Sequence, residues 1–207
     1  MAYSELKRKL DAGDIIILDG GTGTELERRG VPMDSKAWCG PTSLEHLDVL
    51  QAIHQDYIAA GADIIIANTY ASSPLMLGPA GFGNQFEEIN RAAIRTAHKA
   101  REASGRRDVT VAGSLSHMVP VIPGTDRPVS ETGLSQADVF KALRRLASLH
   151  KEEGSDLILL EMMYHPERMK PAFDAASKTG LPVWAGFSVR RGDDGEVLAF
   201  TPHEDIP

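Results

Sequence analysis

The sequence has only one cysteine, Cys39, so it cannot form an internal disulfide, and we expect a cytoplasmic protein. It also lacks an apolar run of about 18 residues, and Met1–Leu10 alternates charged with apolar side chains. We therefore predict neither a transmembrane helix nor a secretory signal, and no membrane partner. Its 22 basic residues are outnumbered by 29 acidic ones and lie scattered along the chain. This distribution argues against a nucleic-acid partner.

The residues that are present indicate one globular domain with a sizeable core, because 42% are hydrophobic and 25% charged. Near the N-terminus, the run Ile15–Leu18 is too short for a helix and too apolar for an exposed strand, which predicts a fully buried parallel strand. Asp19 follows directly, and Gly20, Gly21 and Gly23 would let the backbone turn sharply and approach a ligand. The alternative is a plain glycine-rich turn that Asp19 caps.

The order of apolar strand, polar loop and amphipathic helix recurs along the chain. Thr42 or Ser43 would cap the second long helix and Ser135 the fourth, while 191–198 would form a turn or small hairpin. The alternation indicates βαβ units in one parallel sheet. Strands are predicted at 15–18, 63–68, 109–114, 156–161 and 182–187, and helices at 4–10, 44–60, 85–103, 135–153 and 166–178.

Two α/β architectures fit this order, a doubly wound open sheet and a parallel (β/α)8 TIM barrel. We favour the barrel, because a polar residue follows or ends every predicted strand and the strand ends of a barrel converge on one mouth. Only about the first five strands are present, so 1–207 is expected to be a single barrel domain truncated at its C-terminus, with unpaired apolar edges at its first and fifth strands. The polar residues are Asp19, Asn68, Ser114, Glu161 and Ser188.

The motifs together resemble the homocysteine S-methyltransferase family, whose members are homocysteine-binding (β/α)8 barrels. The resemblance implies that homocysteine, held as a zinc thiolate, attacks a methyl group on a sulfonium, quaternary ammonium or methylated-cofactor donor to give methionine. The matching segments are Leu18–Thr24, Ala67–Tyr70, Val111–Leu115, the strand that ends in Glu161, and Val183–Ser188, which is similar to the family's fifth strand.

The resemblance also implies a substrate site. Asp19 and Glu161 would take the α-ammonium group of homocysteine, and backbone N–H groups around Gly20 and Gly21 would take its carboxylate. An alternative role for Glu161 is an ion pair with an arginine or lysine of a neighbouring loop. The other substrate-binding positions implied by the motifs are Thr22, Asn68 and Thr69.

A methyl-donor pocket is implied by a second resemblance, because residues 38–46 and 70–72 are similar to the betaine–homocysteine methyltransferase branch of the family. In that branch a tryptophan and a tyrosine line the pocket for a cationic group, which implies Trp38 and Tyr70 here; aromatic faces attract such cations. The branch has a further tyrosine where this sequence has Met162, which could still form a soft apolar wall. Trp38 could equally be a plain loop anchor.

The metal site is where the sequence departs most from the family. The family takes three zinc cysteines from later strands, so zinc is expected for the complete barrel, but no metal ligand is assigned in this chain. Cys39 matches no ligand position and is expected to be an inert thiol. His117, in a long loop at 115–134 that could fold over a site, and His165 and His203 have a spacing that fits no zinc motif.

Two functional hypotheses follow. The chain is either the N-terminal part of a homocysteine methyltransferase, or a non-catalytic amino-acid-binding or interaction protein that retains the pocket without zinc. The expected partners are homocysteine and a small methyl donor, and the unpaired edges predict a homo-oligomer or a complementing chain. Residues 1–207 alone are expected neither to bind zinc tightly nor to transfer methyl groups.

Overall fold

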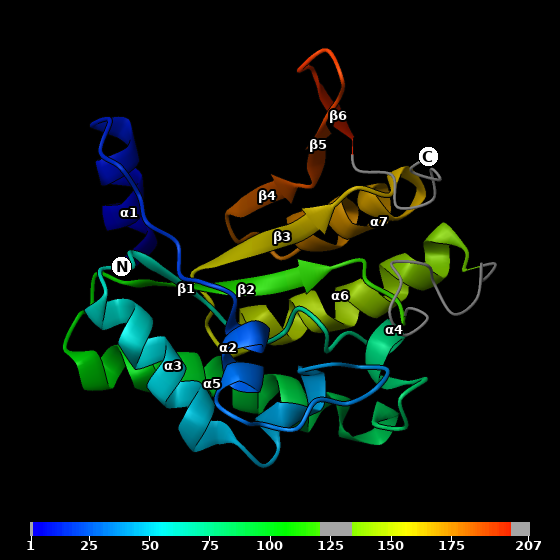
Figure 1. The fold of residues 1–207 in the computed structure, drawn as a ribbon, viewed down its shortest axis with the longest axis horizontal. Helices are drawn as coiled ribbons and strands as arrows, with labels where there is room; N and C mark the ends of the chain where they lie inside the picture. The colour runs from blue at the N-terminus through cyan, green and yellow to red at the C-terminus, as the bar shows by residue number, and fades with distance from the viewer. Residues whose placement is uncertain (1, 121–133, 200–207) are drawn as a thin grey trace.

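The structure is a computed structural model that describes residues 2–120 and 134–199; the predictions that concern 121–133, and His203, lie outside these residues. Its centre is a parallel sheet in the order β1–β2–β3–β4 (Figure 1). The register pairs Ile65 with Val111 and Leu160 with Ala185. This sheet confirms the α/β class. The strands are β1 Ile64–Ile66, β2 Thr110–Ser116, β3 Leu157–Met163 and β4 Val183–Phe187.

Helices alternate with these strands, and Figure 1 shows α3, α5 and α6 together on one side of the sheet. The antiparallel pair β5 and β6 confirms the hairpin predicted near 191–198. In 2–120 and 134–199 no helix is long and apolar enough to cross a membrane. The long helices are α3 Leu47–Ala59, α5 Phe86–Ser104, α6 Gln136–Glu152 and α7 Pro166–Ser177. The shorter elements are α1 Ala2–Asp11, α2 Thr22–Arg28, α4 Pro74–Leu77, the 3-10 turns η1 Gly40–Ser43 and η2 Gly83–Gln85, and β5 Val189–Arg191 and β6 Val197–Ala199.

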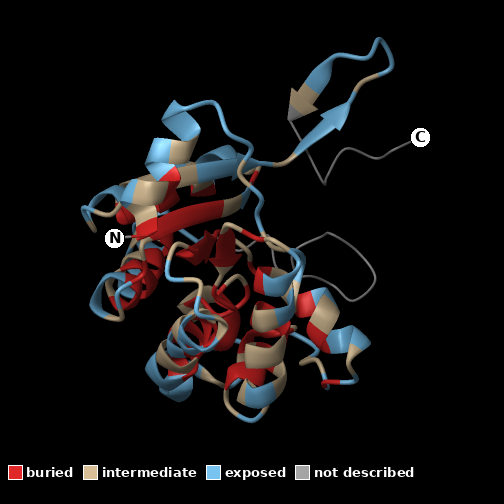
Figure 2. Cartoon of the chain, turned by 90° about the vertical axis from the view of Figure 1, so that its left-hand side faces the viewer, coloured by how far each residue is buried: buried red, intermediate tan, exposed pale blue. Residues whose placement is uncertain are grey.

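The hydrophobic core lies between the sheet and these helices, where Figure 2 shows the buried residues concentrated. Phe86 of α5, Leu143 and Leu146 of α6, and Leu115 and Leu160 of the central strands form one buried cluster. Apolar side chains removed from water at about 25 cal/mol per Å² supply the main stabilising force of such a layer. The helical layer therefore holds the strands in register and brings their carboxyl ends to one edge of the sheet.

Helix α6 begins with the cap that the sequence predicts. Oγ of Ser135 accepts a hydrogen bond from the backbone N–H of Asp138, and the Asp138 carboxylate accepts one from the N–H of Ser135. We expect Ser135→Ala to lower the free energy of unfolding by about 1 kcal/mol, because the backbone N–H of Asp138 loses its side-chain acceptor at the start of the helix. Urea unfolding checks this. The matched control, Ser148→Ala inside the same helix, should cost nothing; an equal loss in both variants would contradict the capping account.

The run Ile15–Leu18 is not the fully buried strand predicted from the sequence. Only Leu18 forms an isolated parallel bridge, with Ile64, and Ile15, Ile17 and Leu18 are 86%, 51% and 42% exposed. The segment lies beside β1, and none of the described strands pairs with its outer side. Apolar strands of parallel sheets are buried by neighbours on both edges and faces, so a segment with one neighbour keeps its side chains exposed.

The start of α3 also differs from the prediction. The helix begins at Leu47, three residues later than expected, and its N-cap is His46 without a side-chain hydrogen bond. Thr42 and Ser43 instead belong to η1, where Oγ1 of Thr42 donates to the carbonyl oxygen of Cys39. The local bond to Cys39 competes with capping, because a threonine hydroxyl readily bonds a nearby carbonyl.

Candidate active site

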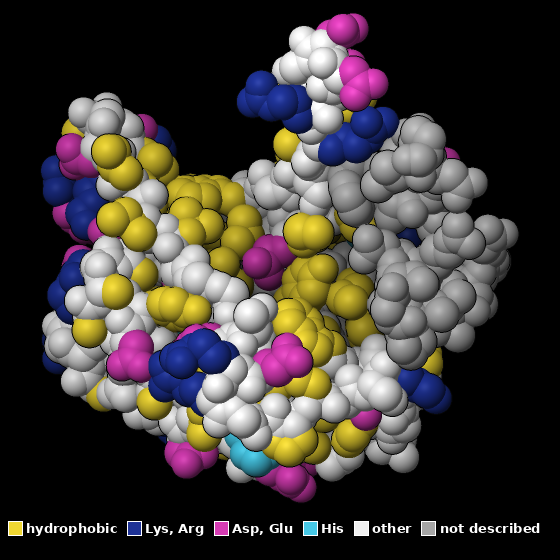
Figure 3. Space-filling model, viewed as in Figure 1, with side chains coloured by type: hydrophobic (Ala, Val, Ile, Leu, Met, Phe, Trp, Pro, Cys, Tyr) yellow, Lys and Arg dark blue, Asp and Glu magenta, His cyan; other side chains and the backbone are white. Residues whose placement is uncertain are grey.

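A cavity of about 320 Å³ is lined by four segments of the chain: the turn after α1 with the start of α2, the loop after α2, the end of β1 with the residues that follow it, and the end of β3. Figure 3 shows this face of the molecule hollowed, with hydrophobic side chains around an acidic group. The chain thus gathers, at one edge of the sheet, segments that are more than a hundred residues apart in sequence. The lining residues are Gly20, Gly21, Thr22, Gly23, Trp38, Cys39, Ile66, Ala67, Asn68, Tyr70, Glu161 and Met162.

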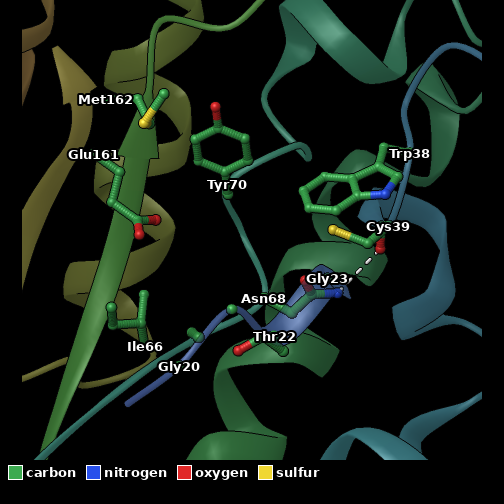
Figure 4. Close-up of a pocket in the computed structure, with 12 residues that line it drawn as sticks. Gly20, Thr22, Gly23, Trp38, Cys39, Ile66, Asn68, Tyr70, Glu161 and Met162 are labelled. Carbon is green, nitrogen blue, oxygen red and sulfur yellow. Dashed lines mark hydrogen bonds between the residues drawn. The ribbon is translucent and has the colours of Figure 1, made fainter. Parts of the chain in front are cut away.

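Glu161 is the acidic side chain of the cavity, and Figure 4 shows its carboxylate directed into the open space. Oγ of Ser114, on the neighbouring strand, donates a hydrogen bond to Oε2 of Glu161. Burial raises the pKa of Glu161 above its ordinary value, while the Ser114 hydrogen bond acts in the opposite direction. No described arginine or lysine forms a salt bridge with Glu161, so the ion pair considered as an alternative is absent from 2–120 and 134–199.

Asp19 is near enough to Glu161 for the charge of Glu161 to affect it, but it is not among the residues that line the cavity. Its Oδ2 accepts a hydrogen bond from the backbone N–H of Ile66 at 2.8 Å, and its Oδ1 is buried without a partner among the described atoms. Burial, and secondarily the charge of Glu161, raises the pKa of Asp19 to about 8. Neither carboxyl group forms a salt bridge with a described lysine or arginine, so an ammonium group bound near them would be stabilised.

The glycine-rich turn at residues 20–23 also lines the cavity. Helix α2 starts at Thr22 with Gly21 as its N-cap, so the N–H groups of its first turn have no acceptor within the helix. Gly20 packs closely against Tyr57, since a Cβ there would lie 2.8 Å from the hydroxyl oxygen of that ring. The turn therefore presents backbone N–H groups on a surface that a ligand can approach closely.

Asn68 and Thr69 serve the architecture around the cavity. Nδ2 of Asn68 donates to the carbonyl oxygen of Cys39 at 3.0 Å and to Oγ1 of Thr42 at 3.2 Å, which ties the loop after α2 to the end of β1. Thr69 is fully buried, does not line the cavity, and donates from Oγ1 to the carbonyl oxygen of Ser114 at 2.9 Å. The predicted contact of both residues with substrate stays a prediction.

The three residues predicted for the methyl-donor pocket lie together on one side of the cavity (Figure 4). The rings of Trp38 and Tyr70 meet edge to face, with centroids 6.3 Å apart. Trp38 and Met162 are the two non-glycine residues with positive φ in the described part of the chain, at 46° and 56°. Such backbone conformations are costly and gather at ligand sites. Gly23 makes room for the indole, since a Cβ there would lie 2.8 Å from Cζ2 of Trp38.

Cys39, Ile66 and Ala67 line the cavity although the sequence did not single them out for the site, and Gly23, predicted only as part of the glycine turn that approaches a ligand, lines it as well. Cys39 was expected to be an inert thiol in a partly buried loop, and it is buried and lines the cavity. Burial raises its pKa to about 12, so the thiol stays protonated at neutral pH. Their position in the sequence could have indicated that these four residues belong to the site, because each lies next to or within a motif already assigned to it.

The described histidines do not form a metal site. His117 is buried, burial lowers its pKa to about 4, and its Nε2 accepts from the backbone N–H of Tyr164 and of His165. No group of three or more histidine, cysteine, aspartate or glutamate side chains in 2–120 and 134–199 is arranged to hold a metal ion. The residues present here therefore do not fit zinc.

The parallel sheet with alternating helices and the cavity at its strand ends define the class of the protein. Residues 16–203 match the family model described as homocysteine S-methyltransferase, and the chain belongs to that family. The metallated form of the homocysteine methyltransferase MmuM from Escherichia coli has the same fold, with a TM-score of 0.74 and 25% identity over 90% of this chain and 67% of that chain. The fold is thus of the TIM-barrel type, and the chain covers part of the barrel.

Relatives of two different names are similar to this chain. Betaine–homocysteine S-methyltransferase 1 of Danio rerio is 27% identical over 198 residues, covering 95% of this chain and 46% of that protein. Homocysteine S-methyltransferase 4 of Zea mays is 25% identical over 197 residues, covering 88% of this chain and 58% of that protein. The chain spans about half the length of the betaine–homocysteine relatives that it matches.

Proposed function

We propose that the protein takes part in methyl transfer from a cationic or methylated-cofactor donor to the sulfur of homocysteine, giving methionine. The observation that carries this proposal is the cavity itself, in which the Glu161 carboxylate and the glycine turn face an aromatic wall. Family membership supports the same reaction class. We further propose that 1–207 forms one homocysteine-binding domain.

The two charged groups of homocysteine would bind to different residues of the cavity. The ammonium group of homocysteine binds at Glu161, close to Asp19, and the homocysteine carboxylate binds to backbone N–H groups at Gly20, Gly21 and Thr22. This places the thiol toward Trp38 and Tyr70. In the transfer, the thiol gives its proton to solvent and the sulfur forms a bond to the methyl carbon. The donor's bond to that carbon breaks and the donor keeps the electron pair, so a cationic nitrogen or sulfur of the donor becomes neutral.

The proposal extends to the metal, the metabolic role, the location and the partners of the protein. We propose that zinc serves the complete family barrel through ligands outside the described residues, and that the protein acts in methionine biosynthesis. A cytoplasmic location is supported by the single buried, free cysteine. Homocysteine and a small methyl donor are the proposed partners, and a second copy or a complementing chain is proposed for the exposed edges at Ile15 and Phe187.

A second candidate function is amino-acid binding without catalysis. It is favoured by the character of the described cavity residues, which supply groups for an amino acid and for a cation but no cluster of metal ligands. Methionine formation separates the two candidates, measured with L-homocysteine and either betaine or S-methylmethionine on the longest natural form of the protein. Turnover supports methyl transfer; homocysteine binding without any turnover supports the second candidate.

Tyr70→Leu should raise the KM of a sulfonium or quaternary ammonium donor about tenfold, because the variant loses the aromatic face that attracts the cation. The Kd of homocysteine should change less than about twofold, since its charged groups bind elsewhere in the cavity. Steady-state kinetics and calorimetry measure the two effects separately. Tyr70→Phe is the matched control and should keep donor affinity. Equal losses for donor and homocysteine in Tyr70→Leu would show that Tyr70 only packs.

A further inference from the structure

The imidazole of His150, on α6, is fully buried among polar groups from three other segments. Its Nε2 lies 3.2 Å from the carbonyl oxygen of Ser114 and 3.2 Å from Oγ1 of Thr69. Its Nδ1 lies 3.2 Å from Oγ of Ser155. Since Thr69 also donates to the Ser114 carbonyl, two side chains converge on that one backbone oxygen.

One arrangement of protons satisfies all these contacts. A carbonyl oxygen only accepts, so the ring nitrogen that faces Ser114 carries the proton and donates it. Nδ1 is then the acceptor, and the hydroxyl of Ser155 donates to it. Burial lowers the pKa of His150 to about 4, which keeps the ring neutral, as this arrangement requires.

Strand β2 is shaped to receive the ring. Its residue next to Ser114 is Gly113, and a Cβ at this position would lie 2.8 Å from Cε1 of His150, closer than real Cβ atoms approach. A glycine inside a strand weakens the strand and marks a place where another group comes close to the backbone. The ring of His150 therefore packs directly against the backbone that carries Ser114.

Ser114 joins this buried cluster to the cavity. Its carbonyl oxygen is held by His150 and Thr69, and its hydroxyl donates to Glu161, whose carboxylate points into the cavity (Figure 4). A displacement of the Ser114 backbone would carry its hydroxyl away from the carboxylate. Hydrogen bonds to a charged group contribute more than those between neutral groups, so this contact is sensitive to its geometry.

We propose that His150 is a positioning residue for Glu161, which it orders by holding Ser114 in place. His150 does not line the cavity and acts only through Ser114. The consequence for homocysteine binding rests on the proposed function, whereas the consequence for the Glu161 carboxylate does not.

The test uses the full chain with His150→Leu, His150→Gln and Ser114→Ala, and two readouts. Titration of the Glu161 carboxyl by carbon-13 NMR should move upward in His150→Leu, because the Ser114 hydrogen bond lowers the pKa of Glu161. The Kd of L-homocysteine should rise about tenfold, the effect of one lost hydrogen bond of ordinary strength. His150→Gln should restore both values in large part, because its amide can donate to the Ser114 carbonyl.

The matched control is His54→Leu. His54 is a fully buried histidine on α3 whose ring nitrogens have no hydrogen-bond partner among the described atoms. Its replacement should leave the Glu161 titration and the Kd unchanged. In a Ser114→Ala background, His150→Leu should have no further effect on either readout, which a merely structural role would not produce.

An unmoved Glu161 titration in folded His150→Leu overturns the proposal, as do additive effects of the His150 and Ser114 substitutions. If His150→Leu does not fold, Ser155→Ala takes its place: it removes the donor to Nδ1, and the Glu161 titration should again move upward, with no change overturning the proposal. A wild-type chain that fails to bind homocysteine contradicts the proposed function, while the titration still decides the role of His150.

Discussion

Replacing Glu161 by glutamine is expected to weaken L-homocysteine binding by about a hundredfold, a loss within the range measured for hydrogen bonds to charged groups. The carboxylate is the one charged side chain among the lining residues, and it is directed into the open space. Glutamine keeps the size and an acceptor for Ser114 but removes the charge that an ammonium group pairs with. Calorimetric titration of wild type and variant measures the change.

The matched control for this charge is Glu88→Gln. Glu88 is an exposed carboxylate in the first turn of α5 and lies outside the cavity, so its replacement should leave the affinity unchanged. Circular dichroism of both variants checks that they fold. If Glu161→Gln binds homocysteine as well as wild type does, then the ammonium group does not pair with Glu161.

The contribution of Asp19 to the stability of the ligand-free protein is expected to fall by about 2 kcal/mol between pH 6.5 and pH 8. The pKa of this carboxyl is raised from 3.8 to about 8 in the folded chain, so over this interval the folded state holds a proton that the unfolded state has lost. The contribution of Asp19 then decreases as pH rises through the interval. The buried His54, His117 and His150, whose pKa values are lowered from 6.5 to about 4, act in the opposite direction: the unfolded imidazoles are half protonated at pH 6.5, so each adds about 0.4 kcal/mol of stability between pH 6.5 and pH 8.

Urea unfolding at several pH values measures this dependence. Asp19→Asn should lack the Asp19 contribution, because its amide does not titrate, so the stability of wild type minus that of the variant should decrease between pH 6.5 and pH 8. Saturating homocysteine should reduce this decrease, since a bound ammonium group favours the charged carboxylate and lowers the pKa of Asp19. A difference between wild type and Asp19→Asn that stays constant or rises over the same interval would contradict the assignment.

The sequence predicted the elements whose signals are local. Ser135 was expected to cap a helix from the residue pattern alone, and the capping box of α6 confirms it, because a cap depends on residues three positions apart. The run Ile15–Leu18 was misjudged, because its hydrophobicity predicts burial while its actual exposure depends on whether another strand lies on its outer side. Pairing with distant strands has no local signal.

The sequence predicted those cavity residues that belong to motifs at the ends of predicted strands. Glu161, Gly20 and Tyr70 were expected at one site and are among its lining residues. Cys39 was missed because its burial against Gly23 is a tertiary contact, and the Thr69 hydroxyl turned out to bond Ser114 away from the cavity. Spacing places a residue near a strand end, but packing decides the direction in which its side chain points.

We propose that this chain recognises the amino-acid part of homocysteine through the Glu161 carboxylate and the backbone N–H groups of the glycine turn. The most direct measurement is a calorimetric comparison of L-homocysteine with 4-mercaptobutanoate, which keeps the thiol and the carboxylate but lacks the α-ammonium group. We expect saturable binding of homocysteine and binding of the analogue weaker by about a hundredfold. Equal affinity for the two compounds, or no binding of homocysteine, would contradict the claim.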